Sequence, residues 1–109
     1  PAYILRNSDL IELKATRNPI GFHMKERDFE KTDFQLQKGD VLYTFSDGYT
    51  DQFGGSGRAK FNKTNFKKLI KTISAKPMEE QKKILDDILG KWKGNNEQTD
   101  DIIVVGVRI

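Results

Sequence analysis

Residues 39–48 read Gly-Asp-Val-Leu-Tyr-Thr-Phe-Ser-Asp-Gly, which places a hydrophobic run between two turn-forming triplets. The run Val41–Phe45 is apolar at nearly every position, a pattern typical of a β-strand buried between layers rather than at a sheet edge. Lys38-Gly39-Asp40 and Ser46-Asp47-Gly48 have the composition of turns and bound the strand on both sides. We therefore expect an inner strand here.

Further strands are predicted on both sides of this run. Tyr3–Leu5 and Leu10–Leu13 flank a cluster of turn formers, Arg6-Asn7-Ser8-Asp9, which predicts a β-hairpin. Alternating apolar and polar residues favour a strand around Phe34–Leu36. The apolar stretch Ile102–Val107 predicts the last strand.

Two helices are expected between residue 64 and residue 94. The first spans Asn65–Ser74, with Thr64 or Asn65 as its N-cap. The second begins at Pro77 and stops before Gly94, since proline favours a first helical turn and glycine a helix end. Its buried residues are expected to be Met78, Leu85, Ile88, Leu89 and Trp92. This order predicts an α+β fold with antiparallel β-sheets flanked by helices, in which the last strand returns to the sheet.

Composition excludes several classes of function. The 109 residues allow one domain at most. Because cysteine is absent and His23 is the only histidine, thiolate and histidine-cluster metal sites are excluded. A metal would need oxygen ligands. The longest apolar stretch is far shorter than the roughly 18 residues of a membrane span, so we expect no membrane span in this segment. The absence of cysteine is compatible with a cytoplasmic location, which we expect.

Two carboxylates mark the ends of the most hydrophobic strands. Asp47 follows Val41–Phe45, and Asp100-Asp101 precedes Ile102–Val107. If the two strands are antiparallel neighbours, Asp47 and Asp100 lie at the same rim, where their repulsion would be relieved by Mg²⁺ or Mn²⁺. The alternative is an ordinary Asp-Gly turn and a solvated strand start.

Three blocks of the sequence resemble a known family. Residues 39–51 are similar to the Gly-Asp, hydrophobic strand, Ser/Thr-Asp-Gly-x-x-Asp/Glu block of the metal-dependent PPM-type protein serine/threonine phosphatases, in particular their bacterial SpoIIE-like branch. Residues 99–105 resemble the closing Asp-Asp/Asn block of that family, and residues 18–21 its x-Pro-Leu/Ile-Gly loop.

The resemblance implies a two-metal Mn²⁺ or Mg²⁺ centre at one end of a β-sandwich, where a metal-activated water hydrolyses phosphoserine or phosphothreonine. Asp47 and Asp100 would be ligands of the same metal ion, whereas Asp101 and Asp51 would support the ligands. The usual partners in this branch are a phosphorylated protein, typically an anti-sigma-antagonist-like one, and an upstream sensor or regulatory domain. The setting implied is cytoplasmic signal transduction.

The resemblance is incomplete at its start. The family's earlier blocks, including an Asp-Gly whose aspartate bridges both metals, have no counterpart in these residues. We therefore expect residues 1–109 to be the C-terminal part of a phosphatase domain. On its own this part is expected to lack some of the active site and to be inactive.

Other features suggest alternatives. Residues 58–93 carry 11 Lys or Arg against 4 Asp or Glu, so a basic nucleic-acid-binding module is possible in principle, as is a catalytically silent partner-docking module. We expect no nucleic acid, because the lysines are not interleaved with exposed aromatic residues. Gly54–Gly57 is expected to be a flexible flap beside the site, with Arg58 or Lys60 near a phosphoprotein. His23 is expected at the surface or the core edge.

Overall fold

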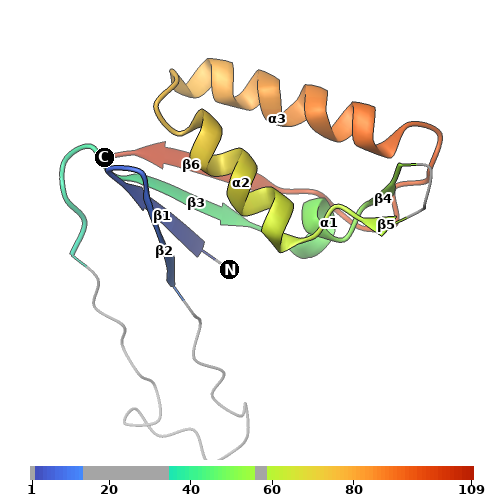
Figure 1. Ribbon diagram of the computed structural model, residues 1–109, viewed down its shortest axis with the longest axis horizontal. Coiled ribbons are helices and arrows are strands. Elements are labelled where there is room, and N and C mark those ends of the chain that lie inside the picture. The colour runs from blue at the N-terminus through green and yellow to red at the C-terminus, as the bar shows by residue number, and fades with distance from the viewer. Residues whose placement is uncertain (1, 14–34, 56–58) are drawn as a thin grey trace, which may run out of the picture.

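The computed structural model describes residues 2–13, 35–55 and 59–109. A four-stranded antiparallel sheet has the order β2-β1-β3-β6 (Figure 1). Its strands are β1 (Ala2–Arg6), β2 (Asp9–Leu13), β3 (Val41–Phe45) and β6 (Val104–Arg108). The predicted hairpin, the inner strand and the returning last strand are thereby confirmed, because β3 pairs with β1 on one side and β6 on the other.

Two long helices cover one face of this sheet, α2 (Lys63–Ile73) and α3 (Met78–Lys93). Between β3 and α2 the chain forms a single helical turn, α1 (Asp47–Thr50), and a short hairpin of β4 (Phe53–Gly54) and β5 (Ala59–Lys60). The α+β class with antiparallel sheets and flanking helices is therefore confirmed. Within the described residues, no helix is long and apolar enough to cross a membrane.

Aromatic rings fill the space between the sheet and α2. Phe66 of α2 is fully buried, and its ring centroid lies 4.6 Å from that of Phe45 and 5.1 Å from that of Tyr49. Tyr3 of β1 packs on Phe45 at 4.9 Å. Tilted aromatic pairs at these separations stabilise a core beyond their area of burial, so α1, α2, β1 and β3 share one core.

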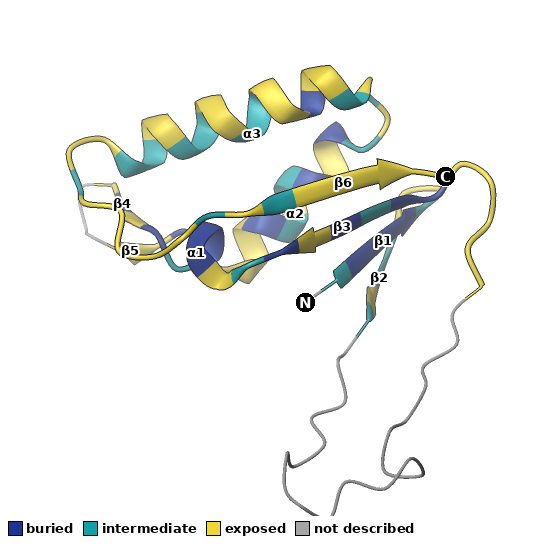
Figure 2. Ribbon diagram, turned by 180° about the vertical axis from the view of Figure 1, so that it is seen from behind, coloured by how far each residue is buried: buried dark blue, intermediate teal, exposed yellow. Residues whose placement is uncertain are grey.

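On the opposite face of the sheet, the residues along β6 are exposed, whereas Ile4 of β1 is buried. Figure 2 shows β6 exposed along its length, and Ile103, Val105, Val107 and Ile109 are 43–57% exposed. On β3, Leu42 is half-buried and Thr44 exposed. Within the described residues β3 is therefore covered on one face only, contrary to the expectation of a strand buried between layers. Two exposed valines on β6, with an exposed isoleucine just before and just after the strand, are typical of a surface that another part of a protein covers.

Some predicted boundaries are wrong. Gln35 and Leu36 are not in a strand, while Phe34 lies outside the described residues. The first helix begins at Lys63 rather than Asn65, because the Asn62 side chain accepts a hydrogen bond from the Asn65 N–H (2.9 Å) and so caps the helix. Pro77 is the N-cap of α3 rather than its first residue, and Gly94 ends that helix as predicted.

An ion pair anchors the start of β3 to the end of β1. Asp40 is 1% exposed and accepts two hydrogen bonds from the Arg6 guanidinium, at 3.0 and 2.8 Å. It also accepts the Gln37 N–H at 2.8 Å. The Arg6 hydrogen bonds, followed by that of Gln37, lower the pKa of the Asp40 carboxyl below its usual range. The sequence indicated only a turn at this position.

We expect Asp40→Asn to destabilise the fold at neutral pH and to have less effect in acid. Because the pKa of Asp40 is lowered in the folded state, its contribution is complete above the unfolded value of 3.8 and is lost as the pH falls through the folded value. Denaturant unfolding at about pH 7 and about pH 2.5 measures the difference. Asp87→Asn, on the exposed side of α3, is the control and should cause little loss at either pH. An equal loss at both pH values for Asp40→Asn would contradict the prediction.

Candidate metal centre

Asp47 stands at the junction of β3 and α1. It is the first residue of α1, its side chain is exposed, and its carbonyl accepts the Asp51 N–H (2.8 Å) that closes the helical turn. Ser46 is the extended residue before it. The end of the strand therefore presents the Asp47 carboxylate to solvent at the rim of the sheet.

Asp100 lies at the same rim. Phe45 is paired with Val104, and the Ser46 N–H donates to the Ile103 carbonyl at 2.9 Å, so the chain before β6 passes directly beside the end of β3. This confirms that the two strands are antiparallel neighbours. The Asp100 side chain is exposed and accepts the N–H of Asp101 (2.7 Å), which orients the carboxylate. Its role as a metal ligand, like that of Asp47, remains a prediction.

Ser46 fastens these two segments together. Its hydroxyl donates to the Asp101 carbonyl (2.9 Å) and accepts the Ile103 N–H (3.1 Å). One side chain thus satisfies two backbone groups that lack a strand partner. The last strand consequently begins at Val104 and not at Ile102 as predicted, because Ser46 takes the place of a ladder residue there.

Gly48 lets the two segments approach. A Cβ atom at this position would lie 2.1 Å from the Asp101 carbonyl oxygen and 3.1 Å from Ile102 Cγ1. Gly48 is helical and does not have a positive φ. The glycine is thus required by close packing and not by a left-handed backbone conformation.

A second anchor holds the loop on the other side of Asp100. Gln52 is 1% exposed, and its amide donates to the Glu97 carbonyl (2.9 Å) and the Phe53 carbonyl (3.0 Å). The backbone carbonyl of Gln52 accepts a hydrogen bond from the indole N–H of Trp92 (2.8 Å). Trp92, like the other apolar residues of α3 that were predicted to be buried, packs against the core but is only half-buried. The loop carrying Asp100 is therefore pinned at Glu97 and at Asp101, and no sequence signal pointed to Gln52.

Tyr49 joins α1 to α3. Its ring is 2% exposed and packs on Phe61, and its hydroxyl donates to the Leu85 carbonyl at 2.7 Å. Burial, with a smaller effect of Asp86, raises the pKa of the Tyr49 hydroxyl well above its usual value. The hydroxyl therefore remains a neutral donor over the physiological range, and the helix that begins with Asp47 is held from both sides.

The remaining predicted residues fall into two groups. Asp51 is the C-cap of α1 and forms an ion pair with Lys60 of β5 (3.6 Å). Asp101 contributes its carbonyl to the rim, while a role for its side chain remains a prediction. Part of the expected flap is ordered as the β4–β5 hairpin. His23, Arg58, residues 18–21 and residues 56–57 lie outside the described residues.

The donor chemistry of this rim fits a hard divalent cation. Asp47 and Asp100 offer carboxylate oxygens, which Mg²⁺ and Mn²⁺ prefer. In residues 2–13, 35–55 and 59–109 there is no group of three or more His, Cys, Asp or Glu that could hold a metal. The described residues therefore supply part of a ligand set.

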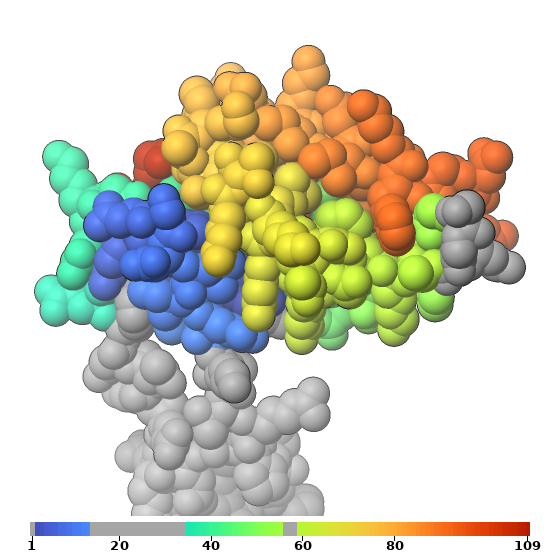
Figure 3. Space-filling model, in the orientation of Figure 1, coloured from blue at the N-terminus to red at the C-terminus, as the bar shows by residue number. Residues whose placement is uncertain are grey.

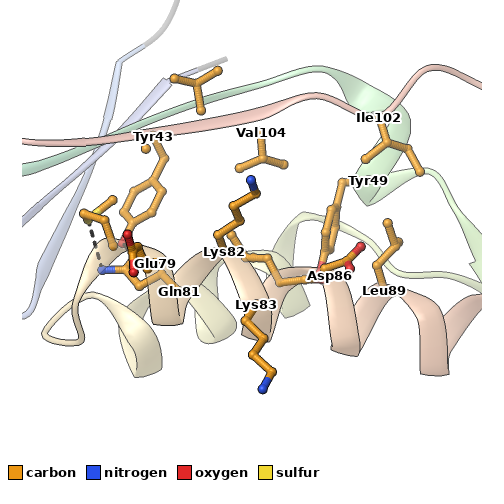
Figure 4. Close-up of a pocket in the computed structure, with 14 residues that line it drawn as sticks. Tyr43, Tyr49, Glu79, Gln81, Lys82, Lys83, Asp86, Leu89, Ile102 and Val104 are labelled. Atoms are coloured by element: carbon orange, nitrogen blue, oxygen red, sulfur yellow. Dashed lines mark hydrogen bonds between the residues drawn. The ribbon is translucent and has the colours of Figure 1, made fainter.

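A groove of about 830 Å³ lies between α3 and the part of the sheet formed by β3 and β6. Figure 4 shows Tyr43 and Tyr49 reaching across it toward α3, with Lys82 directed toward Val104 and Lys83 directed away. The Tyr43 hydroxyl donates to Gln81 Oε1 (2.6 Å), and burial raises the pKa of Tyr43 to about 12. Neither Asp47 nor Asp100 lines the groove.

We expect Gly48→Ala to destabilise the domain that contains this chain by about 1–3 kcal/mol, because the added methyl group must displace the Asp101 carbonyl. Gly90→Ala is the matched control, since a Cβ at Gly90 meets nothing within 4 Å and alanine favours a helix interior by up to about 1 kcal/mol. Thermal and denaturant unfolding measure both changes. Equal effects of the two substitutions would contradict the packing role of Gly48.

Comparisons with known proteins agree with the fold. The SiaA-PP2C domain of Pseudomonas aeruginosa superposes with a TM-score of 0.87 at 27% identity, over 99% of this chain and 42% of that one. The phosphatase domain of the cell fate determinant SpoIIE from Bacillus subtilis superposes with a TM-score of 0.66 at 24% identity, over 100% and 47%. The same domain presoaked with Mn gives 0.67 over 100% and 46%.

The chain thus spans less than half the length of the solved structures it resembles. No curated protein sequence matches it at a significant level. The sequence matches the family Stage II sporulation protein E (SpoIIE) over residues 1–109. This match along the whole chain shows that the protein belongs to the SpoIIE family, as the blocks at residues 39–51 and 99–105 predicted.

Proposed function

We propose that this chain forms the C-terminal part of a metal-dependent protein serine/threonine phosphatase domain. The observation that carries the proposal is the placement of Asp47 and Asp100 at one rim, on segments that Ser46 joins by two hydrogen bonds. Both aspartates belong to the motifs that resemble the PPM family, and the family is supported by the match over the whole chain.

In this proposal Asp47 and Asp100 hold the same Mn²⁺ or Mg²⁺ ion. A bound ion of this kind lowers the pKa of water and neutralises phosphoryl oxygens, so neither cysteine nor a histidine cluster is needed. The role of the protein chain is to hold the two carboxylates in a fixed position relative to each other. Ser46, Gly48 and Gln52 provide it through the contacts on either side of Asp100.

Further residues are needed to complete the domain. Two observations support this: the chain covers 42–47% of the similar domains, and the sheet face along β6 leaves Ile103, Val105 and Val107 exposed. Covering such a face removes apolar surface from water and stabilises the fold. We propose that the missing part also supplies the remaining metal ligands, and that these 109 residues are inactive alone.

The wider setting follows from the same proposal. The substrate would be a phosphorylated protein, of the anti-sigma-antagonist type that the resemblance implies, and an upstream sensor or regulatory domain would control the reaction. A cytoplasmic location fits this role. The Mn-presoaked structure of the Bacillus subtilis domain supports manganese as a cofactor of the family fold.

The test is Asp47→Asn in a polypeptide that contains the complete phosphatase domain. We expect hydrolysis of p-nitrophenyl phosphate in Mn²⁺ to fall about a hundredfold or more, because a metal ligand is worth several kcal/mol of barrier. Mn²⁺ affinity, measured by calorimetry, should fall in parallel.

Asp87→Asn serves as control, since it makes the same chemical change at an exposed position of α3. It should leave hydrolysis and Mn²⁺ affinity as in the wild type. Full activity of the Asp47→Asn protein would refute the assignment of this residue as a ligand.

A further inference from the structure

The charges of α2 are all of one sign. The helix carries Lys63, Lys67, Lys68 and Lys71, and residues 52–78 contain no aspartate or glutamate. Lys63, Lys67 and Lys71 are spaced four residues apart and lie along one side of the helix. We call Lys63, Lys67, Lys68 and Lys71 the lysine row. Helix α2 lies on the face of the molecule shown in Figure 3.

The neighbouring helix, α3, has charges at its ends that stabilise a helix. In α3, Glu79 and Glu80 occupy the first turn and Lys91 and Lys93 the last, which complements the helix dipole. α2 has no acid in its first turn and begins with Lys63. Like charges at i and i+4 and a cation at a helix N-terminus both oppose folding. The lysine row therefore has an arrangement that intramolecular stability does not favour.

Contacts within the chain neutralise one member of the row. Lys67 is paired with Glu12 of β2 (3.3 Å) and lies over the Tyr3 ring. Lys63, Lys68 and Lys71 are exposed and form no ion pair with the part of the chain that the structure describes. Three cations are thus presented to solvent.

The row starts beside the candidate metal centre. The Asn62 N–H, at the N-cap of α2, donates to the Thr50 carbonyl at the end of α1 (2.8 Å), and α1 begins with Asp47. From Lys63 to Lys71 the helix advances about 12 Å, at 1.5 Å per residue. About four residues of extended chain cover that distance. A polypeptide reacting at the rim has its neighbouring residues within reach of the row.

We propose that the lysine row docks an acidic segment of the phosphoprotein substrate, next to its phosphorylated residue. The inference rests on the proposed phosphatase function and adds to it a preference for acidic sequence context. A protein partner fits better than nucleic acid, because the aromatic residue of α2, Phe66, is fully buried and offers no surface for base stacking.

The experiment uses the full-length protein that contains this chain and compares Lys63→Gln/Lys68→Gln/Lys71→Gln with Lys82→Gln/Lys83→Gln/Lys91→Gln. Both triple variants remove three positive charges, the first from α2 and the second from exposed positions of α3. Glutamine has a helix propensity close to that of lysine, so both helices are retained, which circular dichroism checks.

Two phosphoserine peptides of equal length serve as probes, one with four flanking aspartates and one with neutral flanks. We expect wild type to bind the acidic peptide about tenfold more tightly by fluorescence anisotropy at low salt, and to show a similar advantage in kcat/KM. The α2 triple variant should lose the advantage, and the α3 variant should keep it. Hydrolysis of p-nitrophenyl phosphate should be equal in all three proteins.

The outcomes separate the two proposals. Absence of p-nitrophenyl phosphate hydrolysis by wild type in Mn²⁺ refutes the phosphatase function, while the binding measurement still tests docking. Equal binding of the two peptides by wild type, or an equal loss in both triple variants, overturns the lysine row as a docking surface. Tighter binding of a labelled DNA duplex than of the acidic peptide, lost only in the α2 variant, assigns the row to nucleic acid instead.

Discussion

The arrangement of the rim depends on the close approach of the Asp101 carbonyl to Gly48. Because no side chain larger than hydrogen fits there, the segment before β6 lies directly against the start of α1. Ser46 holds this contact with two hydrogen bonds to backbone groups of Asp101 and Ile103. Asp47 and Asp100 are each next to a residue of this contact, so their relation is set by backbone packing rather than by long side chains. A site preorganised in this way spends little free energy on ordering its ligands.

The helix layer is joined to this rim by polar groups as well as by apolar packing. Tyr43 of β3 and Tyr49 of α1 each have a buried ring and donate a hydrogen bond to α3. Gln81, which receives the Tyr43 bond, also donates to the Lys76 carbonyl in the turn between α2 and α3. Buried polar groups that are fully paired favour one arrangement over others. Apolar residues of α3, including Leu85, Leu89 and Trp92, pack against the core beside these bonds.

Much of the fold was predictable from local patterns. The hairpin, β3, both long helices and the return of the last strand follow from hydrophobic periodicity and turn residues, and Asp47 and Asp100 follow from their positions at strand ends. The Asn62 cap was missed because that residue has a positive φ of 69°, which its neighbours in sequence do not indicate. The single turn α1 and the hairpin β4–β5 are too short for periodicity to reveal. Gln52 and the pair Arg6–Asp40 were missed because their partners lie about 30 to 45 residues away.

By itself, the sequence determined the family, the order of the elements and the two candidate carboxylates, because these depend on motifs and on short-range periodicity. It also determined that any metal here must have oxygen ligands. Only the tertiary structure decided why Gly48 and Ser46 stand beside Asp47, since their function is to contact a segment more than 50 residues further along the chain. The structure also showed that three of the four lysines of α2 are exposed and that their row begins next to α1, because a net charge does not say where the charges lie relative to a site.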